Sequence, residues 1–516
     1  MNKEKNKLKK LLLEHVPNEI FFEIFEYMEF YEVYYGFYHL NKRFKNLIMD
    51  SKFLSKINIP YISKLNFEFF YQNIIIKNEH HIKILILSNI FINDIILSSF
   101  DFSLKFINLK ILIITHINEN IFDKTFDELK CLYGLNSLTI KFNESIENLN
   151  KIFSKIISLS KLKYFKIKYQ TINDQNQSIN YFNKYNYSKI EYLIIEGNLS
   201  INSLNNLLYY FPKLHHVSIN YLFYSHHDIQ LYSSIQLKNL KYVSLKIYLI
   251  KFNQFEKIIK NLFYHVEIFK ISTHYDEKYL DAKKWEYLIT SYMPKLRIFD
   301  INHDGFISEN ELTYHDVINQ FKSSFWMEKK WFFKHEHNWL ERLNSGVFYS
   351  AQPYSRIVPL SQLTKLIIKK FNLDLNEMID ILYSTSELQI FKCDFLSLDN
   401  FNSIETGKHH AFEHVLEKNK IKMLHLRSNC TSEKLRLVID LFHEIKHLTI
   451  GIQCTQMIET TKYLLSYKHK LRHLFFLCIS DISEVYIKNL INMIEKEKLL
   501  SDYFIKFINR KIYLWW

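Results

Sequence analysis

The stretch LKILII, residues 109–114, contains the pattern that decides the fold. An apolar residue is followed by two residues of any kind, an apolar residue, one residue of any kind and a last apolar residue. The same pattern begins at thirteen further positions, which are Ile82, Leu135, Leu162, Ile190, Leu214, Leu240, Val266, Leu296, Leu363, Leu388, Ile421, Ile445 and Leu471. In a strand, the fourth and sixth residues share one face and the third and fifth share the other. Each copy therefore predicts a short strand with one buried face.

The copies recur at a regular spacing. Residues 82 to 296 cover 214 residues in eight steps, and residues 363 to 471 cover 108 in four, a mean of about 27 in both runs. Segments between copies, such as residues 204–210 and 255–263, have apolar residues at helical spacing. Because one strand and one helix cannot form a core alone, successive units are expected to stack.

The pattern and its period resemble leucine-rich repeats. The resemblance implies an α/β solenoid with short parallel strands on the concave face and helices on the convex face. The family's asparagine, third after the sixth residue, occurs in only three copies, as Asn143, Asn198 and Asn429, so the repeats are irregular. The alternative is a doubly wound sheet, which would need glycine-rich strand ends that this sequence lacks.

Upstream of the copies, residues 16–48 predict three short helices. Pro17 suits the first turn of a helix, and Glu19 follows where a carboxylate favours the helix dipole. The first helix has one broad apolar stripe, formed by Ile20, Phe21, Ile24, Phe25 and Met28. Three helices of this size expose more apolar surface than they can bury in each other. Something else must cover the remainder.

This stretch resembles an F-box, the module that binds the Skp adaptor of a Skp–cullin–F-box ubiquitin ligase. The matching segments are VPNEI (16–20), residues 24–25, Leu40 and NKRF (41–44), although the family usually has Leu at the position of Val16 and Trp at that of Phe44. The resemblance implies adaptor contacts at Pro17, Ile20, Ile24, Phe25, Leu40 and Phe44. An ordinary helical cap on a larger domain is the alternative.

The sequence thus predicts an α/β chain with a three-helix F-box followed by an irregular leucine-rich-repeat solenoid. Residues 303–362 interrupt the repeats and contain Trp326, Trp331 and Trp339, either as degenerate repeats or as an inserted hairpin or helix available for binding. The expected organisation is a basic tail (1–11), the F-box (12–56), a helical linker (57–80), the first repeats (81–302), the tryptophan-rich segment (303–362), and further repeats with a C-terminal cap (363–516).

The third, fifth and seventh residues of each copy are expected to line the concave face, where tyrosines and cations dominate. The residues that we expect to bind a target are Tyr164, Lys166, Lys168, Tyr192, Tyr242, Lys246, Lys369 and Arg427. Tyrosine supplies rigid contact area and lysine a charge partner, so the face suits an acidic or phosphorylated protein segment. The alternative is that lysine occupies every exposed position alike.

Composition and charge argue against several other classes of function. The net charge of +13 is spread along the chain, and only residues 3–10 form a basic run, so nucleic acid is an unlikely partner despite the basic face. No apolar segment is long enough to predict a membrane span. Five cysteines without a CxxC pair suggest a reduced protein of the cytoplasm or nucleus. Lysine, asparagine and isoleucine are abundant throughout, which we interpret as codon bias.

The sequence predicts no catalytic site, no cofactor and no metal site. Residues 300–311 (DINHDGFISENE) fit a twelve-residue calcium loop. However, Pro294 would interrupt the entering helix, and Asp300 is the fifth residue of the copy that begins at Leu296. We therefore interpret the match as accidental. The neighbouring histidines at 215–216, 226–227 and 335–337 lack further ligands at a recognisable spacing.

Overall fold

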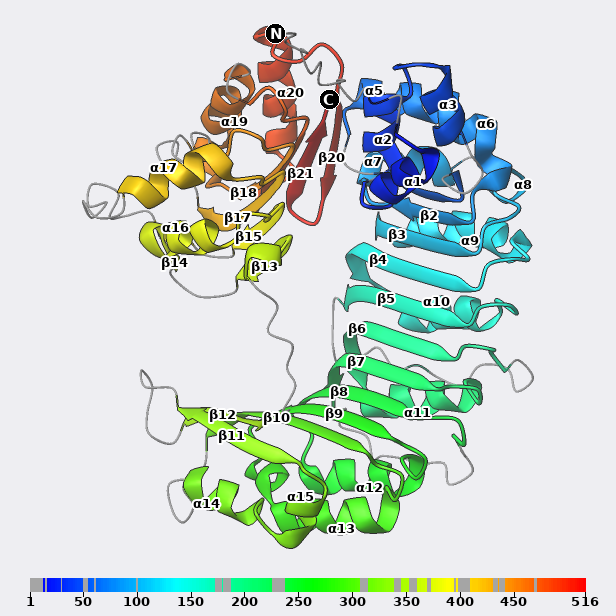
Figure 1. Ribbon diagram of the computed structural model, residues 1–516, viewed down its shortest axis with the longest axis vertical. Helices are drawn as coiled ribbons and strands as arrows, with labels where there is room; N and C mark the ends of the chain where they lie inside the picture. Colours follow the sequence, from blue (N-terminus) through cyan, green and yellow to red (C-terminus); the bar gives the residue numbers. More distant parts are fainter. Residues whose placement is uncertain are drawn as a thin grey trace, which may run out of the picture.

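The computed structural model describes residues 13, 16–28, 30–49, 54–59, 62–98, 101–171, 179, 187–224, 237–306, 314–337, 345–351, 360–368, 373–393, 396–397, 409–429, 435, 441–467 and 471–516. Within them the chain is an α/β protein with two large sheets, each covered by helices (Figure 1). The prediction of an α/β fold with parallel strands is confirmed.

The first sheet has the strand order β1-β2-β3-β4-β5-β6-β7-β8-β9-β10-β12-β11. Neighbours from β1 to β10 are parallel, and the last two pairings are antiparallel. The strands are β1 (Lys56–Ile59), β2 (Ile84–Leu87), β3 (Ile111–Ile117), β4 (Ser137–Ile146), β5 (Tyr164–Thr171), β6 (Tyr192–Ser200), β7 (His216–Phe223), β8 (Tyr242–Tyr248), β9 (Ile268–His274), β10 (Ile298–Phe306), β11 (Phe332–His337) and β12 (Ser345–Ala351).

The second sheet has the order β13-β15-β17-β18-β19-β21-β20, parallel as far as β19 and closed by an antiparallel hairpin. A small parallel pair, β14 (Leu373–Asp374) and β16 (Leu396–Ser397), lies beside it. The strands of the second sheet are β13 (Lys365–Ile368), β15 (Ile390–Cys393), β17 (Met423–Asn429), β18 (His447–Gly451), β19 (Phe476–Ser480), β20 (Phe504–Ile508) and β21 (Lys511–Trp515).

The repeated pattern places the strands. In thirteen of the fourteen copies a described strand begins at the third residue. Backbone hydrogen bonds join the second residues of successive copies, at the N-terminal ends of the strands, and we call this series of bonds the ladder. The Lys110 N–H donates to the Lys83 carbonyl at 2.8 Å, and the Asn136 N–H donates to the Lys110 carbonyl at 2.9 Å. The fourth and sixth residues of these thirteen copies are buried, as predicted for one face of a strand, except Leu366 and Ile368 of β13, which are half-buried.

The prediction that a copy begins at Leu471 is wrong, because the copy that forms the strand begins three residues later. β19 begins at Phe476, and the Phe475 N–H donates to the Lys446 carbonyl at 3.3 Å, which is the ladder bond of a second residue. The overlapping match LFFLCI, residues 474–479, therefore forms this strand.

One copy was missed in the sequence. Residues 54–59 (LSKINI) fit the pattern, form β1, and accept the ladder bond from the Lys83 N–H at the Ser55 carbonyl, 2.8 Å away. The expected linker, residues 57–80, thus includes most of the first strand. Its helical part is α5 (Lys64–Phe70), η2 (Tyr71–Ile75), α6 (Ile76–Asn78) and η3 (Glu79–His81).

The tryptophan-rich segment closes the first sheet. After β10 come α14 (Tyr314–Gln320) and α15 (Ser324–Glu328), and then β11 and β12, whose antiparallel hairpin pairs with β10. Trp326 is fully buried and Trp331 nearly so, where they pack around Phe299. These two rings therefore form core and are not available for binding, and Trp339 lies outside the described residues.

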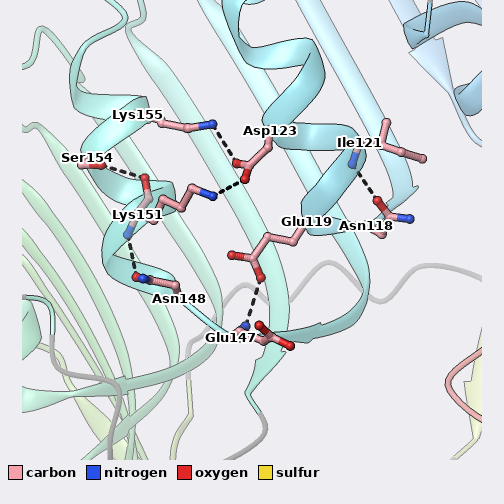
Figure 2. Close-up of polar contacts among 9 residues, drawn as sticks. All are labelled: Asn118, Glu119, Ile121, Asp123, Glu147, Asn148, Lys151, Ser154 and Lys155. Carbon is pink, nitrogen blue, oxygen red and sulfur yellow. Dashed lines mark hydrogen bonds and ion pairs between the residues drawn. The ribbon is translucent and has the colours of Figure 1, made fainter.

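Helices cover one face of each sheet (Figure 1). Asparagines begin several of them, because the side chains of Asn118 and Asn148 accept the backbone N–H of Ile121 and Lys151 at 2.7 and 2.9 Å (Figure 2). Asparagine thus has a structural role at these positions beyond codon bias. The helices are α7 (Ile90–Leu97), α8 (Phe102–Lys105), α9 (Glu119–Cys131), α10 (Leu149–Ile157), α11 (Ile201–Tyr210), α12 (Phe252–Leu262), η4 (Glu277–Leu280), α13 (Ala282–Tyr292), η5 (Leu360–Gln362), α16 (Leu375–Ser384), α17 (His409–Lys418), η8 (Cys454–Gln456), α19 (Met457–Ser466) and α20 (Tyr486–Lys496).

Charged side chains join neighbouring helices on this outer face. Asp123 of α9 accepts from both Lys151 and Lys155 of α10, the second at 2.7 Å (Figure 2). Burial acts to raise the pKa of Asp123, but the two lysines outweigh it and lower that pKa. The contact therefore aligns α9 with α10 in addition to the apolar packing beneath them.

The end of the second sheet contacts the start of the first. Trp515 of β21 donates a hydrogen bond of 2.6 Å from its indole to the carbonyl of Ile62 and stacks on Phe91 of α7. Lys506 of β20 forms an ion pair with Asp94 of α7. The hairpin of β20 and β21 accordingly lies beside α5 and α7, so that the chain closes into a ring (Figure 1).

Candidate functional sites

The N-terminal helices are α1 (Asn18–Glu26), α2 (Phe30–Phe37) and α3 (Lys42–Ile48). They enclose a small aromatic core, in which Phe21 meets Phe44 edge-on at 4.8 Å and Phe25 meets Phe37 at 5.0 Å. Asn41 caps α3 by accepting the N–H of Phe44 at 3.1 Å. This core fixes which side of α1 faces outward.

Ile20, Ile24 and Leu40 form an exposed set that we call the apolar row. Their exposed fractions are 43%, 42% and 55%, and Pro17 is exposed beside them in sequence. Arg43 of α3 donates to the side chain of Asn18 at 2.8 Å and so joins α3 to the start of α1. The row therefore belongs to one compact helical unit.

Two of the residues expected to contact an adaptor are instead buried. Phe25 is 2% exposed and Phe44 is 1% exposed, because both rings fill the core between the helices. The apolar stripe of α1 is wide enough to cover two sides of the helix, and its phenylalanines lie on the side that faces the core. Phe25 and Phe44 can support a contact surface but do not form it.

Aromatic side chains from four adjacent strands line one face of the first sheet. Tyr164, Tyr192, His216 and Tyr242 are the third residues of their copies, and we call them the aromatic ladder. Ring centroids are 6.4 Å apart between Tyr164 and Tyr192, 5.8 Å between Tyr192 and His216, and 4.0 Å between His216 and Tyr242. Three of these residues were expected to bind a target, and the stacking adds His216.

The lysines beside the ladder are partly neutralised. Lys166 and Lys168 both contact the carboxylate of Glu196, at 2.5 and 3.3 Å. Burial acts to raise the pKa of Glu196, but hydrogen bonds and charge from these lysines outweigh it and lower that pKa. Lys246 is exposed on β8 and has no ion pair among the described residues. Positive charge on this face is therefore smaller than the sequence suggests.

The remaining expected target contacts lie elsewhere. Arg427 is exposed on β17 of the second sheet, and Lys369 lies outside the described residues. The expected set is therefore split, with six residues on the first sheet. Figure 1 shows the two sheets as separate arcs of the ring.

The described residues offer no metal cluster, since no group of three or more His, Cys, Asp or Glu side chains converges there. Asp300 lies in β10, parallel to β9, so the prediction that it belongs to a strand is confirmed. His303 is buried and contacts the Thr273 hydroxyl at 2.8 Å. Residues 307–311, the second part of the calcium-loop match, lie outside the described residues.

No model of a known protein family and no characterised protein matches this chain. Within the part of the chain that the structure describes, no helix has the length and apolarity needed to cross a bilayer. The apolar row on the N-terminal helices and the aromatic ladder on the first sheet are candidate contact surfaces.

Proposed function

We propose that this protein is a non-catalytic substrate-recognition subunit of a Skp–cullin–F-box ubiquitin ligase. In this proposal α1 to α3 act as an F-box, the repeated strands and helices form a leucine-rich-repeat solenoid, and the solenoid binds a protein target. The observation that carries the proposal is the apolar row, because three large aliphatic side chains stay exposed on a unit whose core is already filled with aromatic rings.

The apolar row has the character of a protein contact. Full burial of an aliphatic side chain contributes about 1.5–3 kcal/mol, so covering three half-exposed ones contributes roughly 2–4 kcal/mol. Grouped apolar side chains on a folded surface commonly mark protein interfaces. Pro17, Ile20, Ile24 and Leu40 would touch the adaptor, while Phe25 and Phe44 hold α1 and α3 in place.

The repeats support the second part of the proposal. Strands that recur about every 27 residues and share a ladder of backbone bonds within each sheet present a continuous surface on that sheet, as solenoid proteins do when they bind partners. The aromatic ladder would supply contact area, and Lys246 and Arg427 would attract an acidic or phosphorylated segment. Ubiquitin transfer would then follow from proximity, with the chemistry performed by other subunits.

A pull-down of the purified full chain with a Skp adaptor tests the proposal. The double variant Ile20→Asp/Ile24→Asp is expected to lose binding while its circular dichroism and melting temperature stay close to those of the wild type. Leu104→Asp, on α8, is the matched control, since Leu104 is 75% exposed and lies outside the helical unit.

Two outcomes would count against the ligase role. Failure of the wild-type chain to bind an adaptor would favour a leucine-rich-repeat scaffold that binds proteins without a ligase role. Equal loss of binding in Leu104→Asp would mean that the apolar row is not the contact.

A further inference from the structure

A cavity of about 150 Å³ lies where the two sheets meet. One wall comes from the first sheet, with His116 of β3 and Lys141 of β4. The other comes from the second sheet, through residues that include Lys392 of β15, His447 of β18 and Lys511 of β21. The cavity has room for about five water molecules at ~30 Å³ each, which is the scale of a small oxyanion.

The described residues that line this cavity carry positive charge without a counter-charge. They include three lysines and three histidines, but no carboxylate. Lys141, Lys392 and Lys511 form no ion pair with any described residue. Other lysines on the strands do have carboxylate partners, as Lys166 has Glu196 and Lys270 has Asp300. The cavity therefore brings three lysines together with no acid among its described lining residues.

The lysines of the two sheets repel one another. Burial, followed by the charges of Lys392, Lys168, Lys511 and Lys365, lowers the pKa of Lys141 to about 8. Burial and three neighbouring lysines likewise lower the pKa of Lys392. Burial lowers the pKa of His116 to about 3, so this ring is neutral near pH 7 and can still form a hydrogen bond. Closing the ring thus concentrates positive charge in a partly enclosed cavity whose three lysines are half-buried.

We propose that this cavity binds a small phosphate-type anion, held between Lys141 of the first sheet and Lys392 and Lys511 of the second. Ammonium groups on opposite walls can each donate to an anion oxygen. The anion would offset the repulsion and hold the two ends of the ring together. This inference does not depend on the adaptor, because the apolar row shares no residue with the cavity.

An acidic side chain of a bound protein is a less suitable occupant. A carboxylate would present two oxygens to lysines on both walls, whereas a tetrahedral oxyanion presents oxygens in every direction. The geometry therefore favours a small tetrahedral anion.

The test measures the melting temperature of the purified full chain in inorganic phosphate, with sodium chloride at equal ionic strength as the reference, because salt alone screens the lysines. A ligand that binds only the folded state raises the melting temperature as its concentration passes the dissociation constant. We expect phosphate to raise it further than chloride does. Glycerol phosphate in a parallel series distinguishes a free anion from a phosphate monoester by which of the two binds more tightly.

Three variants locate the site. Lys141→Met and Lys392→Met should each weaken phosphate binding about tenfold or more by calorimetry, since each removes a charged donor. Without phosphate, both variants should melt at or above the wild-type temperature, because a buried repulsion is removed. Lys334→Met, at an exposed position of edge strand β11, is the control and should bind phosphate as the wild type does.

The proposal fails if phosphate raises the melting temperature no more than chloride does at equal ionic strength. It also fails if Lys141→Met and Lys392→Met bind phosphate as tightly as the wild type. Either result would leave adaptor binding by the apolar row untouched, so the two proposals can fail separately.

Discussion

The indole N–H of Trp515 donates to the carbonyl of Ile62 at 2.6 Å, which joins β21 of the second sheet to the segment between β1 and α5 at the start of the first. Trp515 is fully buried, and its ring lies 5.5 Å from that of Phe91 and 5.9 Å from that of Phe67. A buried tryptophan with its N–H paired contributes both apolar area and a satisfied donor. The junction of the ring is therefore a piece of continuous core.

Trp515→Ala is expected to lower the free energy of unfolding by about 3–5 kcal/mol, because it leaves a cavity between the sheets. Trp515→Phe keeps an aromatic ring and leaves the Ile62 carbonyl without its donor, so its cost should be smaller, about 1–3 kcal/mol. Urea denaturation followed by circular dichroism measures both. Equal stability of Trp515→Ala and the wild type would show that the junction is not core.

The buried and exposed residues of the helical unit should respond differently to truncation. Phe44→Ala removes a ring that packs on Phe21 and Phe37, so we expect a loss of about 3–5 kcal/mol in stability. Ile24→Ala should change stability by less than about 1 kcal/mol and weaken adaptor binding instead. Parallel measurement of melting temperature and adaptor pull-down separates the two. A stable Phe44→Ala would contradict the aromatic core.

Glu196→Gln is expected to strengthen binding of an acidic peptide to the first sheet. The change releases Lys166 and Lys168 from their shared carboxylate. Since an exposed pair is worth about 0.2–1 kcal/mol, affinity for a polyglutamate probe should rise roughly twofold to fivefold at low salt. Glu256→Gln, which frees Lys260 on the outer helix α12, is the matched control. Unchanged affinity in Glu196→Gln would place acidic peptides elsewhere.

The pH dependence of stability should report Lys141. Its pKa is about 8 in the folded protein and 10.5 in the unfolded reference, so between these values the unfolded chain binds more protons. Stability therefore rises with pH across this window, and the penalty for the buried charge is fully present only below about pH 8. Urea midpoints at pH 7, 8 and 9 should rise less in Lys141→Met than in the wild type. Parallel curves would contradict the assignment.

The repeated pattern was the part of the fold that the sequence could predict. The prediction succeeds because the side chains of each strand alternate between two faces and the fourth and sixth residues lie on the inner one. The same apolar pattern therefore recurs in successive units. The pattern fails where it overlaps itself, since both LRHLFF and LFFLCI contain apolar residues at the required positions. The copy at Leu54 was missed because it lies across the expected boundary between the F-box (12–56) and the linker (57–80). The hairpin of β11 and β12 carries no copy, so the sequence left this segment open between degenerate repeats and an inserted hairpin or helix.

The candidate sites were predictable only in part. The stripe on α1 showed that apolar surface would remain, but it did not show that Phe25 turns inward while Ile24 turns outward. That choice depends on Phe37 and Phe44, which belong to other helices. The lysines of the cavity come from β4, β15 and β21 and meet only because the ring closes. No local sequence pattern indicates that these three lysines lie close together.

Closure of the ring also determines how late in synthesis the core at the junction can form. Ile62 and Trp515 are 453 residues apart, and a ribosome that adds about 5–20 residues per second needs roughly 20–90 s to go from one to the other. Throughout that interval Phe91 has no indole to stack on, and the walls of the cavity have not met. The start of the first sheet therefore keeps apolar surface uncovered until β21 has been synthesised. A nascent chain halted before β21 is expected to bind chaperones that the finished protein releases.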